Sequence, residues 1–364
     1  MIIHLIAAAR PNFMKIAPLY HALKKESWAA PVIVHTGQHY DLNMSDVFFK
    51  DFGLPQPDVH LNVGSGTHAE QTGHVMIAYE KVLLERRPDL VVVVGDVNST
   101  AAATLAAVKL GVKVAHLEAG LRSFDRTMPE EINRLVTDAL SDIVWTPSAD
   151  GDENLLREGV DRKKIHRVGN IMIDSLVMMK KQIESADAFS ALNIERGGFA
   201  LVTLHRPSNV DSPEQLGRIC DILHHIASRL FVVFPVHPRT LKNLEQEKRI
   251  ESLRQNPRII LREPLGYVTF MNLVHNSRFL LTDSGGVQEE TTFLGIPCLT
   301  LRPNTERPVT VTQGTNTLCT IGDVEQMVGD ILSGKYKKGS VPALWDGNTA
   351  QRIVKNIKDL FLST

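Results

Sequence analysis

The stretch Thr282-Asp-Ser-Gly-Gly-Val-Gln-Glu-Glu290 follows an apolar run, 279–281, and precedes residues that can continue as a helix to 294. This pattern predicts a buried strand, a turn of small residues and a helix. Such a turn leaves backbone N–H groups unpaired at the helix N-terminus, where the helix dipole adds positive charge, so a phosphate fits there. Glu290 is placed to accept hydrogen bonds from ribose hydroxyls. An ordinary strand-to-helix turn has similar small residues, so other motifs have to decide between the two interpretations.

Short apolar runs alternate with amphipathic stretches along the rest of the chain, which predicts an α/β fold. In the N-terminal half the predicted strands are 2–8, 32–36, 90–95, 112–116 and 143–146, with helices such as 18–26 and 69–87 between them. In the C-terminal half they are 199–204, 230–236, 258–261, 279–281 and 297–301, with helices such as 213–229. Their nearly continuous aliphatic content is typical of parallel strands that are covered on both faces.

The two series of strands predict two Rossmann-like, doubly wound domains. We expect an N-terminal domain over 1–184, a polar linker over 185–198 and a C-terminal domain over 199–350. The last helical stretch, 351–364, can pack on either domain, and the N-terminal domain is the candidate. Because open α/β sheets bind ligands beyond the carboxyl ends of their strands, the active site is expected in an interdomain cleft.

The composition limits the kinds of ligand and location. With 43% hydrophobic residues, 22% charged residues and a formal net charge of −1, the chain has no bulk field that favours nucleic acid or an acidic membrane. Its three cysteines, Cys220, Cys298 and Cys319, are widely spaced and indicate a reducing compartment. The sequence shows neither a signal peptide nor an apolar run long enough to span a membrane, so a cytoplasmic location is expected.

Carboxylates stand at three strand or helix ends of the N-terminal half. Asp96 follows the apolar run 90–94, Glu118 follows the run 112–116, and Glu130 opens a predicted helix. A carboxylate at a buried strand end is costly unless it is paired or used. A cluster of carboxylates raises the pKa of at least one member, which produces an acid and a base at neutral pH. Helix capping and dipole pairing are the structural alternatives for these side chains.

Basic side chains and histidines follow other predicted strands, namely Arg10, Lys15, His205, Arg206, His237 and Arg307. Arg10 and Lys15 can both reach an anion at a helix N-terminus. A histidine at a strand end binds phosphate or transfers a proton, although a lone histidine is more often structural. The first strand is not followed by Gly-x-Gly-x-x-Gly, and the sequence has no metal-ligand spacing, so we expect neither a dinucleotide cofactor nor a metal.

In their order along the chain, these motifs resemble those of the non-hydrolysing UDP-N-acetylglucosamine 2-epimerases. The matching stretches are Arg10-Pro-x-x-x-Lys15, Gly37-Gln-His39, Gly95-Asp96, His116-Leu-Glu-Ala-Gly-Leu-Arg122, Pro129-Glu-Glu-x-Asn-Arg134, His205-Arg206, Asp283-Ser-Gly-Gly-x-Gln-Glu-Glu290 and Thr305-Glu-Arg-Pro308. The resemblance implies a fold of the glycosyltransferase-B type and interconversion of UDP-GlcNAc and UDP-ManNAc. It implies anti elimination of UDP to 2-acetamidoglucal, followed by re-addition with protonation on the other face of C2, without metal or nicotinamide.

The resemblance also implies roles for individual residues. It assigns proton transfer to Asp96, Glu118 and Glu130, and contacts with the sugar and diphosphate to Arg10, Lys15 and His205. It assigns the phosphate turn to Ser284, Gly285 and Gly286, the ribose contact to Glu290, and further nucleotide contacts to Phe270 and Arg307. It implies a homodimer and a second, allosteric UDP-GlcNAc pocket that includes Gln38, Arg206 and His237.

Several positions depart from the common family pattern, including Ala8-Ala9 before Arg10, Pro207-Ser208 after Arg206, and Leu265. Similar variants of the first motif occur in relatives that act on modified sugars such as UDP-2,3-diacetamido-glucuronate, so this substrate is the first alternative. A glycosyltransferase on the same fold, a hydrolysing 2-epimerase and a catalytically idle UDP-sugar sensor are the remaining alternatives. A transferase or a sensor has little use for the three carboxylates.

Overall fold

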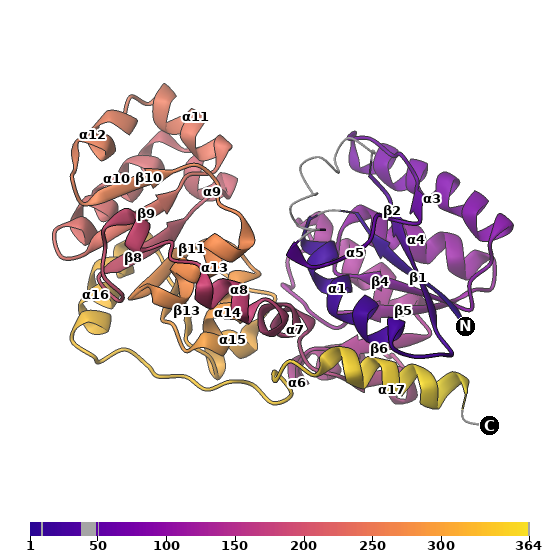
Figure 1. Ribbon diagram of the computed structural model, residues 1–364. Helices are drawn as coiled ribbons and strands as arrows, with labels where there is room; N and C mark the ends of the chain where they lie inside the picture. The colour runs from indigo at the N-terminus through magenta and orange to yellow at the C-terminus, as the bar shows by residue number, and fades with distance from the viewer. Residues whose placement is uncertain (9, 38–48, 50, 363–364) are drawn as a thin grey trace. The chain divides into compact units, whose positions relative to one another are not determined.

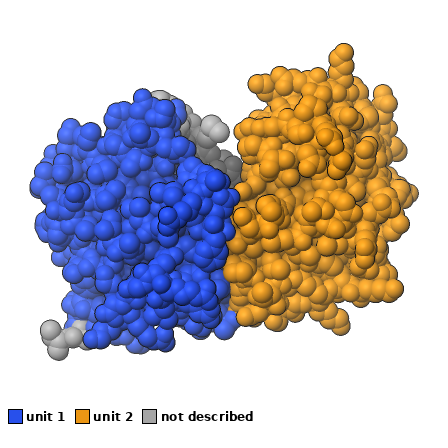
Figure 2. Space-filling model, turned by 180° about the vertical axis from the view of Figure 1, so that it is seen from behind, with its two compact units in different colours: residues 1–179, 343–364 blue, residues 180–342 orange. Residues whose placement is uncertain are grey.

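The computed structural model describes residues 1–8, 10–37, 49 and 51–362, and Figure 1 shows its helices and strands. The chain divides into two compact units, which Figure 2 distinguishes by colour. Unit 1 consists of Met1–Met179 and Ala343–Thr364, and unit 2 of Lys180–Pro342. Each unit has a parallel sheet whose strands alternate with helices, so the predicted α/β class is confirmed.

The strands of unit 1 form one sheet in the order β3-β2-β1-β4-β5-β6-β7, and every pairing is parallel. The strands are β1 (Ile2–Ala7), β2 (Ala30–His35), β3 (Val59–His60), β4 (Leu90–Val94), β5 (Lys113–Leu117), β6 (Ile143–Thr146) and β7 (Ile165–Arg167). The helices are α1 (Arg10–Lys24), α3 (His68–Glu85), α4 (Asn98–Lys109), α5 (Pro129–Leu140), α6 (Ala149–Arg157), α7 (Ile171–Met178) and α17 (Thr349–Phe361), with the short turn η1 (Arg162–Lys164).

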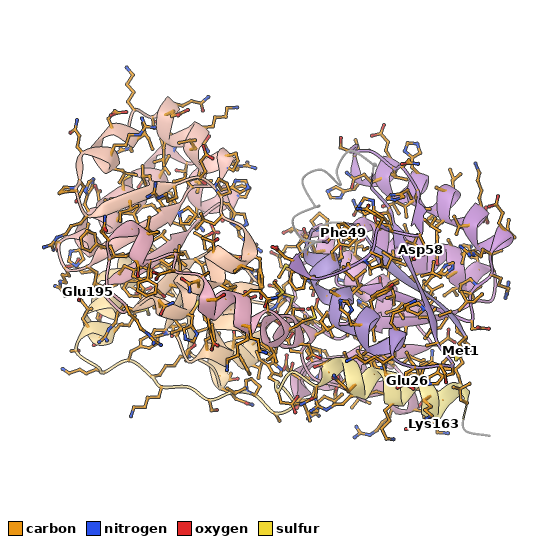
Figure 3. All side chains as sticks on the ribbon, in the orientation of Figure 1. Met1, Glu26, Phe49, Asp58, Lys163 and Glu195 are labelled. Atoms are coloured by element: carbon orange, nitrogen blue, oxygen red, sulfur yellow. The ribbon has the colours of Figure 1, made fainter. Side chains whose placement is uncertain are left out.

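Every residue of β4 is at most 1% exposed, because helices cover both faces of the sheet at its centre. Aromatic side chains extend this packing beside α1, where the rings of Phe13 and Phe49 lie 4.7 Å apart between centroids (Figure 3). The chain runs outward from β1 to β3 and then returns to β4, on the other side of β1. The ends of β1 and β4 are therefore the topological switch point, where such sheets bind ligands.

The strands of unit 2 lie in the order β10-β9-β8-β11-β12-β13, again all parallel. They are β8 (Phe199–Thr203), β9 (Phe231–Pro235), β10 (Ile259–Arg262), β11 (Phe279–Thr282), β12 (Cys298–Thr300) and β13 (Asn316–Leu318). The helices are α8 (Lys180–Ser185), α9 (Pro207–Val210), α10 (Pro213–Ala227), α11 (Pro238–Gln246), α12 (Ile250–Gln255), α13 (Tyr267–Asn276), α14 (Val287–Leu294), α15 (Pro308–Thr312) and α16 (Ile321–Leu332), with the short turn η2 (Ser190–Leu192). Here the switch point lies at the ends of β8 and β11.

The stretch 185–198, which the sequence suggested as a linker, lies inside unit 2. Asn272 of α13 holds its beginning, since the side chain donates to the Ile183 carbonyl at 2.8 Å and accepts from the Ala188 N–H at 3.2 Å. The N–H of Gly197 donates to the carbonyl of Asn276 at 2.8 Å. These bonds make the stretch part of the packed unit rather than a free connection.

The C-terminal stretch from Ala343 onward belongs to unit 1, where α17 (yellow in Figure 1) packs against α1 and α7. The carboxylate of Asp174 accepts the N–H groups of Thr349 and Ala350, at 3.1 and 2.8 Å, and so caps the N-terminus of α17. The indole of Trp345 donates to the Pro147 carbonyl at 2.9 Å. The predicted helical pattern 18–26 is the second half of α1, which begins at Arg10 and has Pro18 in its interior, so the helix N-terminus expected beside Arg10 and Lys15 is confirmed.

Among the described residues, we find no helix with the length and apolar character needed to cross a membrane.

Candidate active site

Lys15 and Glu118 form a buried ion pair at the switch point of unit 1. Lys15 comes from the second turn of α1 and Glu118 from the turn after β5, and their side chains are 10% and 3% exposed. Gly95 lies directly beneath the pair, because a Cβ atom there would lie 3.2 Å from Lys15 Nζ and 3.6 Å from Glu118 Oε2. Glu118 Oε1 is buried without a hydrogen-bond partner in the described part of the chain.

Asp96 follows Gly95 and forms an ion pair with Nη1 of the buried Arg134 on α5. Arg134 is fixed in turn by Glu131, whose Oε2 accepts from Nη2 at 2.8 Å. Glu131 also accepts the N–H groups of Ser123 and Phe124, at 3.0 and 2.8 Å. Burial alone would raise the pKa of Glu131, but these backbone bonds and Arg134 lower it instead. The sequence contained Glu131 and Arg134 in a quoted motif, but nothing in it paired Arg134 with Asp96.

A second buried network fixes the two turns that bear Asp96 and Glu118. His116 Nδ1 lies 2.6 Å from Asp138 Oδ1, and its Nε2 lies 2.8 Å from the Gly95 carbonyl oxygen. Asp138 also accepts the N–H of Gly120 at 3.1 Å. Burial would raise the pKa of Asp138, but His116 and Arg122 outweigh burial and lower it. The sequence analysis did not single out Asp138, because it lies in the last turn of the amphipathic helix α5 and not at a strand end.

Glu130 does not join this group through any contact in the described structure. It is exposed in the first turn of α5, and among the described residues no hydrogen bond or ion pair links it to Asp96 or Glu118. Arg10 is the first residue of α1, but its side chain lies outside the described structure. Gln38 lies outside the described residues altogether.

Asp283 organises the switch point of unit 2, where β8 and β11 are neighbours. This fully buried carboxylate accepts the N–H groups of His205, at 3.0 Å, and Arg206, at 2.9 Å, and the side-chain amide of Asn209 at 3.0 Å. His205 Nδ1 lies 3.0 Å from Asp283 Oδ1. Burial would raise the pKa of Asp283, but its bonds with His205, Asn209 and the Arg206 N–H lower it. The Asp283 carboxylate therefore connects residues 204–206, called here the His205 loop, to the predicted phosphate turn. The sequence analysis did not foresee this connection.

The turn Ser284-Gly285-Gly286 leads into α14, which begins at Val287. A Cβ atom on Gly285 would lie 2.7 Å from Glu306 Oε1 and 3.0 Å from Arg307 Nη1, so only glycine fits there without a shift. Glu306 lies in ion pairs with Arg302 at 2.9 Å and Arg307 at 2.6 Å. Burial opposes the charge on Glu306, but Arg307 and Arg302 hold the pKa of this carboxyl well below its usual range. The turn thus lies at a helix N-terminus beside two buried arginines, Arg302 and Arg307, whose charges are balanced by Glu306 and Glu289.

Two further predicted residues lie on α13 and α14. Glu290 is 4% exposed and accepts a hydrogen bond from the hydroxyl of Tyr267 at 2.8 Å. Phe270 is partly buried, one turn after Tyr267. The ring of His237 lies 5.4 Å from that of His205 between centroids, and its Nδ1 accepts the N–H of Arg239 at the start of α11. Arg206 donates from Nε to the Asp283 carbonyl at 3.0 Å, so Arg206 and His237 both border the His205 loop.

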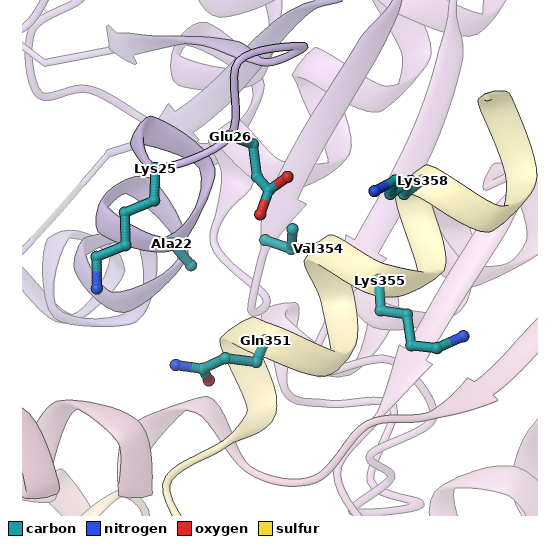
Figure 4. Close-up of a pocket in the computed structure, with 7 residues that line it drawn as sticks. All are labelled: Ala22, Lys25, Glu26, Gln351, Val354, Lys355 and Lys358. Atoms are coloured by element: carbon teal, nitrogen blue, oxygen red, sulfur yellow. The ribbon is translucent and has the colours of Figure 1, made fainter.

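Two hollows in the surface are relevant, one in each unit. One of about 830 Å³ lies beyond the ends of β9 and β10, where Val236, Leu261, Pro264 and Leu265 give it apolar walls. A smaller hollow, of about 350 Å³, lies between α1 and α17 and is lined by Lys25, Lys355 and Lys358 (Figure 4). Neither hollow has a predicted catalytic or nucleotide-binding residue in its lining, although Leu265 of the first is one of the positions that depart from the family pattern.

Known proteins resemble the chain over nearly its whole length. The family model for UDP-N-acetylglucosamine 2-epimerase matches residues 21–358. A UDP-N-acetylglucosamine 2-epimerase of Methanocaldococcus jannaschii is 43% identical over 365 residues, which cover 98% of each chain. A UDP-2,3-diacetamido-2,3-dideoxy-D-glucuronate 2-epimerase of Pseudomonas aeruginosa is 42% identical over 326 residues, which cover 89% of each chain.

Solved structures agree with this assignment. The crystal structure of the M. jannaschii enzyme in complex with UDP-GlcNAc and UDP matches with a TM-score of 0.86 at 42% identity, covering 98% of this chain and 99% of that one. A lipopolysaccharide outer core galactosyltransferase matches with a TM-score of 0.54 at 17% identity and shows a likeness of fold alone, which agrees with the predicted glycosyltransferase-B type. The two parallel sheets, the residues gathered at their switch points and these matches together show that the chain belongs to the UDP-N-acetylglucosamine 2-epimerase family of isomerases.

Proposed function

We propose that this protein interconverts UDP-GlcNAc and UDP-ManNAc by elimination and re-addition of UDP, without hydrolysis. The observation that carries the proposal is the buried Lys15–Glu118 pair next to Asp96, which gives the switch point of unit 1 two carboxylates with different partners. A relative that is 43% identical bears the name of this epimerase, and it has been crystallised with UDP-GlcNAc and UDP. A simple sugar-nucleotide sensor needs no such pair.

We assign nucleotide binding to unit 2. The diphosphate binds at the Ser284-Gly285-Gly286 turn, where helix N–H groups and the nearby Arg307 stabilise its charge. Glu290 accepts the ribose hydroxyls, and Phe270 with the hollow near Leu265 receives the uracil. His205, which Asp283 orients, contacts the diphosphate on the sugar side.

We assign proton transfer to unit 1. A carboxylate removes the C2 proton, the C1–O bond breaks with its electron pair on the departing UDP, and a C1=C2 double bond forms in 2-acetamidoglucal. UDP then adds back to C1 while C2 takes a proton on the opposite face. Glu118 and Asp96 are the proton carriers supported by geometry, and Glu130 is the third candidate from the family resemblance. Arg10 and Lys15 supply positive charge, and the charge that develops on UDP is stabilised by groups already in place.

A 2-epimerase of a modified sugar is the second candidate, because the P. aeruginosa relative is almost as similar as the M. jannaschii one. The reaction at C2 is the same in both proposals, and only the substituents at C3 and C6 differ.

Incubation with each nucleotide sugar separately tests the proposal. The purified protein is given UDP-GlcNAc or UDP-2,3-diacetamido-glucuronate, and the products are separated by chromatography. We expect UDP-ManNAc from the first substrate, with a kcat/KM well above that for the second. A reversed preference would assign the protein to the modified sugar, and release of free ManNAc with UDP would contradict the non-hydrolysing mechanism.

A further inference from the structure

Glu290 is a buried acid whose hydrogen-bond partner is a buried phenol. The Tyr267 hydroxyl donates to Glu290 Oε1 at 2.8 Å, and the two residues are 7% and 4% exposed. A hydrogen bond to an ionised group is stronger than one between neutral groups. This bond therefore affects both the orientation of the Glu290 carboxylate and its protonation state.

Tyr267 is well placed to fix that direction. It is the first residue of α13, directly after the N-cap Gly266, and its ring is packed in the unit. Phe270 follows three positions later, so the two aromatic residues are neighbours on one face of the helix. The same helix thus presents Phe270, which we assign to the base, and the phenol that holds the assigned ribose ligand.

We infer that Tyr267 is a positioning residue for nucleotide binding: its hydroxyl keeps the Glu290 carboxylate oriented and ionised for the ribose hydroxyls. This inference rests on the proposed function and deepens it, since Tyr267 acts on the nucleotide through Glu290. A protonated Glu290 has one oxygen committed as an O–H donor and accepts ribose hydroxyls less well.

Burial and a neighbouring charge favour the protonated form of Glu290, and the Tyr267 hydroxyl acts against both effects. The pKa of Glu290 is raised to about 7: burial raises it most, the hydrogen bond from Tyr267 lowers it, and the like charge of Glu289 raises it. The charged or titratable groups on the elements around α14 are Tyr267 and His275 on α13, Cys298 on β12, and Arg307 before α15. Arg307 is paired with Glu289 at 2.9 Å and with Glu306, and the side-chain donor to Glu290 in the described structure is Tyr267.

The test is the affinity for UDP as a function of pH in the wild type, Tyr267→Phe and Glu290→Gln. Calorimetry gives each Kd from mildly acidic to mildly alkaline pH. Division by the Kd of Glu290→Gln at the same pH removes the pH dependence that does not come from Glu290, because that variant has no acid at position 290. Tyr336→Phe is the matched control, since Tyr336 is another largely buried tyrosine of unit 2 whose hydroxyl donates to the Thr315 and Cys298 carbonyls.

In the wild type we expect the ratio to show tighter binding as pH rises through about 7. In Tyr267→Phe the same rise should come about one pH unit higher, because the lost hydrogen bond is worth at least the 1.36 kcal/mol of one unit. Tyr336→Phe should leave the midpoint unchanged. If Tyr267→Phe does not fold, 3-fluorotyrosine at position 267 is a stronger donor and should move the midpoint to lower pH.

A Tyr267→Phe midpoint equal to that of the wild type, with Glu290→Gln binding UDP weakly, would overturn the role of Tyr267 and leave the proposed function standing. Glu290→Gln binding UDP as tightly as the wild type at every pH would instead remove Glu290 from the nucleotide site. That second result would contradict the residue assignment in the proposed function and the inference together.

Discussion

Lys15 and Glu118 are joined by a buried ion pair that lies directly over Gly95, the residue before Asp96. Gly95 has φ +68° and Glu118 has φ +72°, so both turns use left-handed backbone where the strands β4 and β5 end. For a glutamate this conformation is costly, and such strain persists where the surrounding structure enforces it, often at active sites. The pair therefore connects the fold of unit 1 with its proposed chemistry.

Removal of Lys15 should destabilise the protein. Lys15→Met leaves the buried Glu118 carboxylate without its cation, and loss of one partner of a buried pair costs about 3–5 kcal/mol. The double variant Lys15→Met with Glu118→Gln should recover part of this loss, since the uncompensated charge is gone. Thermal and denaturant unfolding give the free energy of unfolding of the single and the double variant. Lys113→Met is the control, because its pair with Asp142 is exposed and worth about 0–1 kcal/mol. Equal losses of stability in Lys15→Met and Lys113→Met would show that the buried ion pair contributes no more to stability than the exposed one.

Asp96→Asn should abolish most turnover and leave nucleotide binding intact. Loss of a general acid or base costs about 10²–10⁴-fold in rate. Because Asp96 is not among the proposed UDP ligands, the Kd for UDP should stay within a few-fold. Asp142→Asn removes another carboxylate of unit 1, outside the site, and should keep its rate. Near-normal kcat in Asp96→Asn would rule out proton transfer by this residue.

Gly285→Ala should weaken UDP binding by an order of magnitude or more. The new Cβ atom would lie 2.7 Å from Glu306 Oε1 and would push apart the carboxylate and arginines beneath the turn. Gly329→Ala, in the middle of α16, meets no atom closer than Arg229 Nη1 at 4.0 Å and should bind UDP normally. Calorimetry compares the two. Unchanged affinity in Gly285→Ala would contradict the phosphate-turn assignment.

Glu290 should make the ligand-free protein less stable as pH rises. Its folded-state pKa, about 7, exceeds its ordinary value of 4.5, so the folded protein retains a proton that the unfolded chain has released between these values. Stability then falls across this window, by roughly 3 kcal/mol from this group. Glu290→Gln should lose this slope in thermal unfolding, whereas the exposed-site variant Glu251→Gln should keep it. Parallel pH profiles for wild type and Glu290→Gln would contradict the prediction.

Much of the fold could be read from the sequence, because central strands such as β4 and β11 are buried on both faces and appear as continuous apolar runs. Three short strands, β3, β7 and β13, were missed. They lie at the edges of their sheets, where burial no longer demands an apolar run and register depends on the neighbouring strand. Residues 10–17 of α1 were not joined to the helical pattern 18–26, since that pattern is amphipathic whereas the preceding turns are buried nearly all round.

The candidate site was predictable only where a residue follows directly from a strand, as Asp96, Glu118 and His205 do. The partners of these residues were not predictable. Asp283 reaches His205 because β8 and β11 are neighbours in the sheet, and Arg134 reaches Asp96 from 38 residues away. Such pairings depend on sheet order and helix rotation, which a single sequence does not specify.

The central claim, proton transfer at C2, is tested most directly by proton NMR of UDP-GlcNAc incubated with the protein in D2O. The proposed mechanism predicts that UDP-ManNAc appears and that both epimers carry deuterium at C2, because the removed proton exchanges with solvent before UDP adds back. Epimerisation with the C2 proton fully retained would contradict proton abstraction by Glu118 and Asp96.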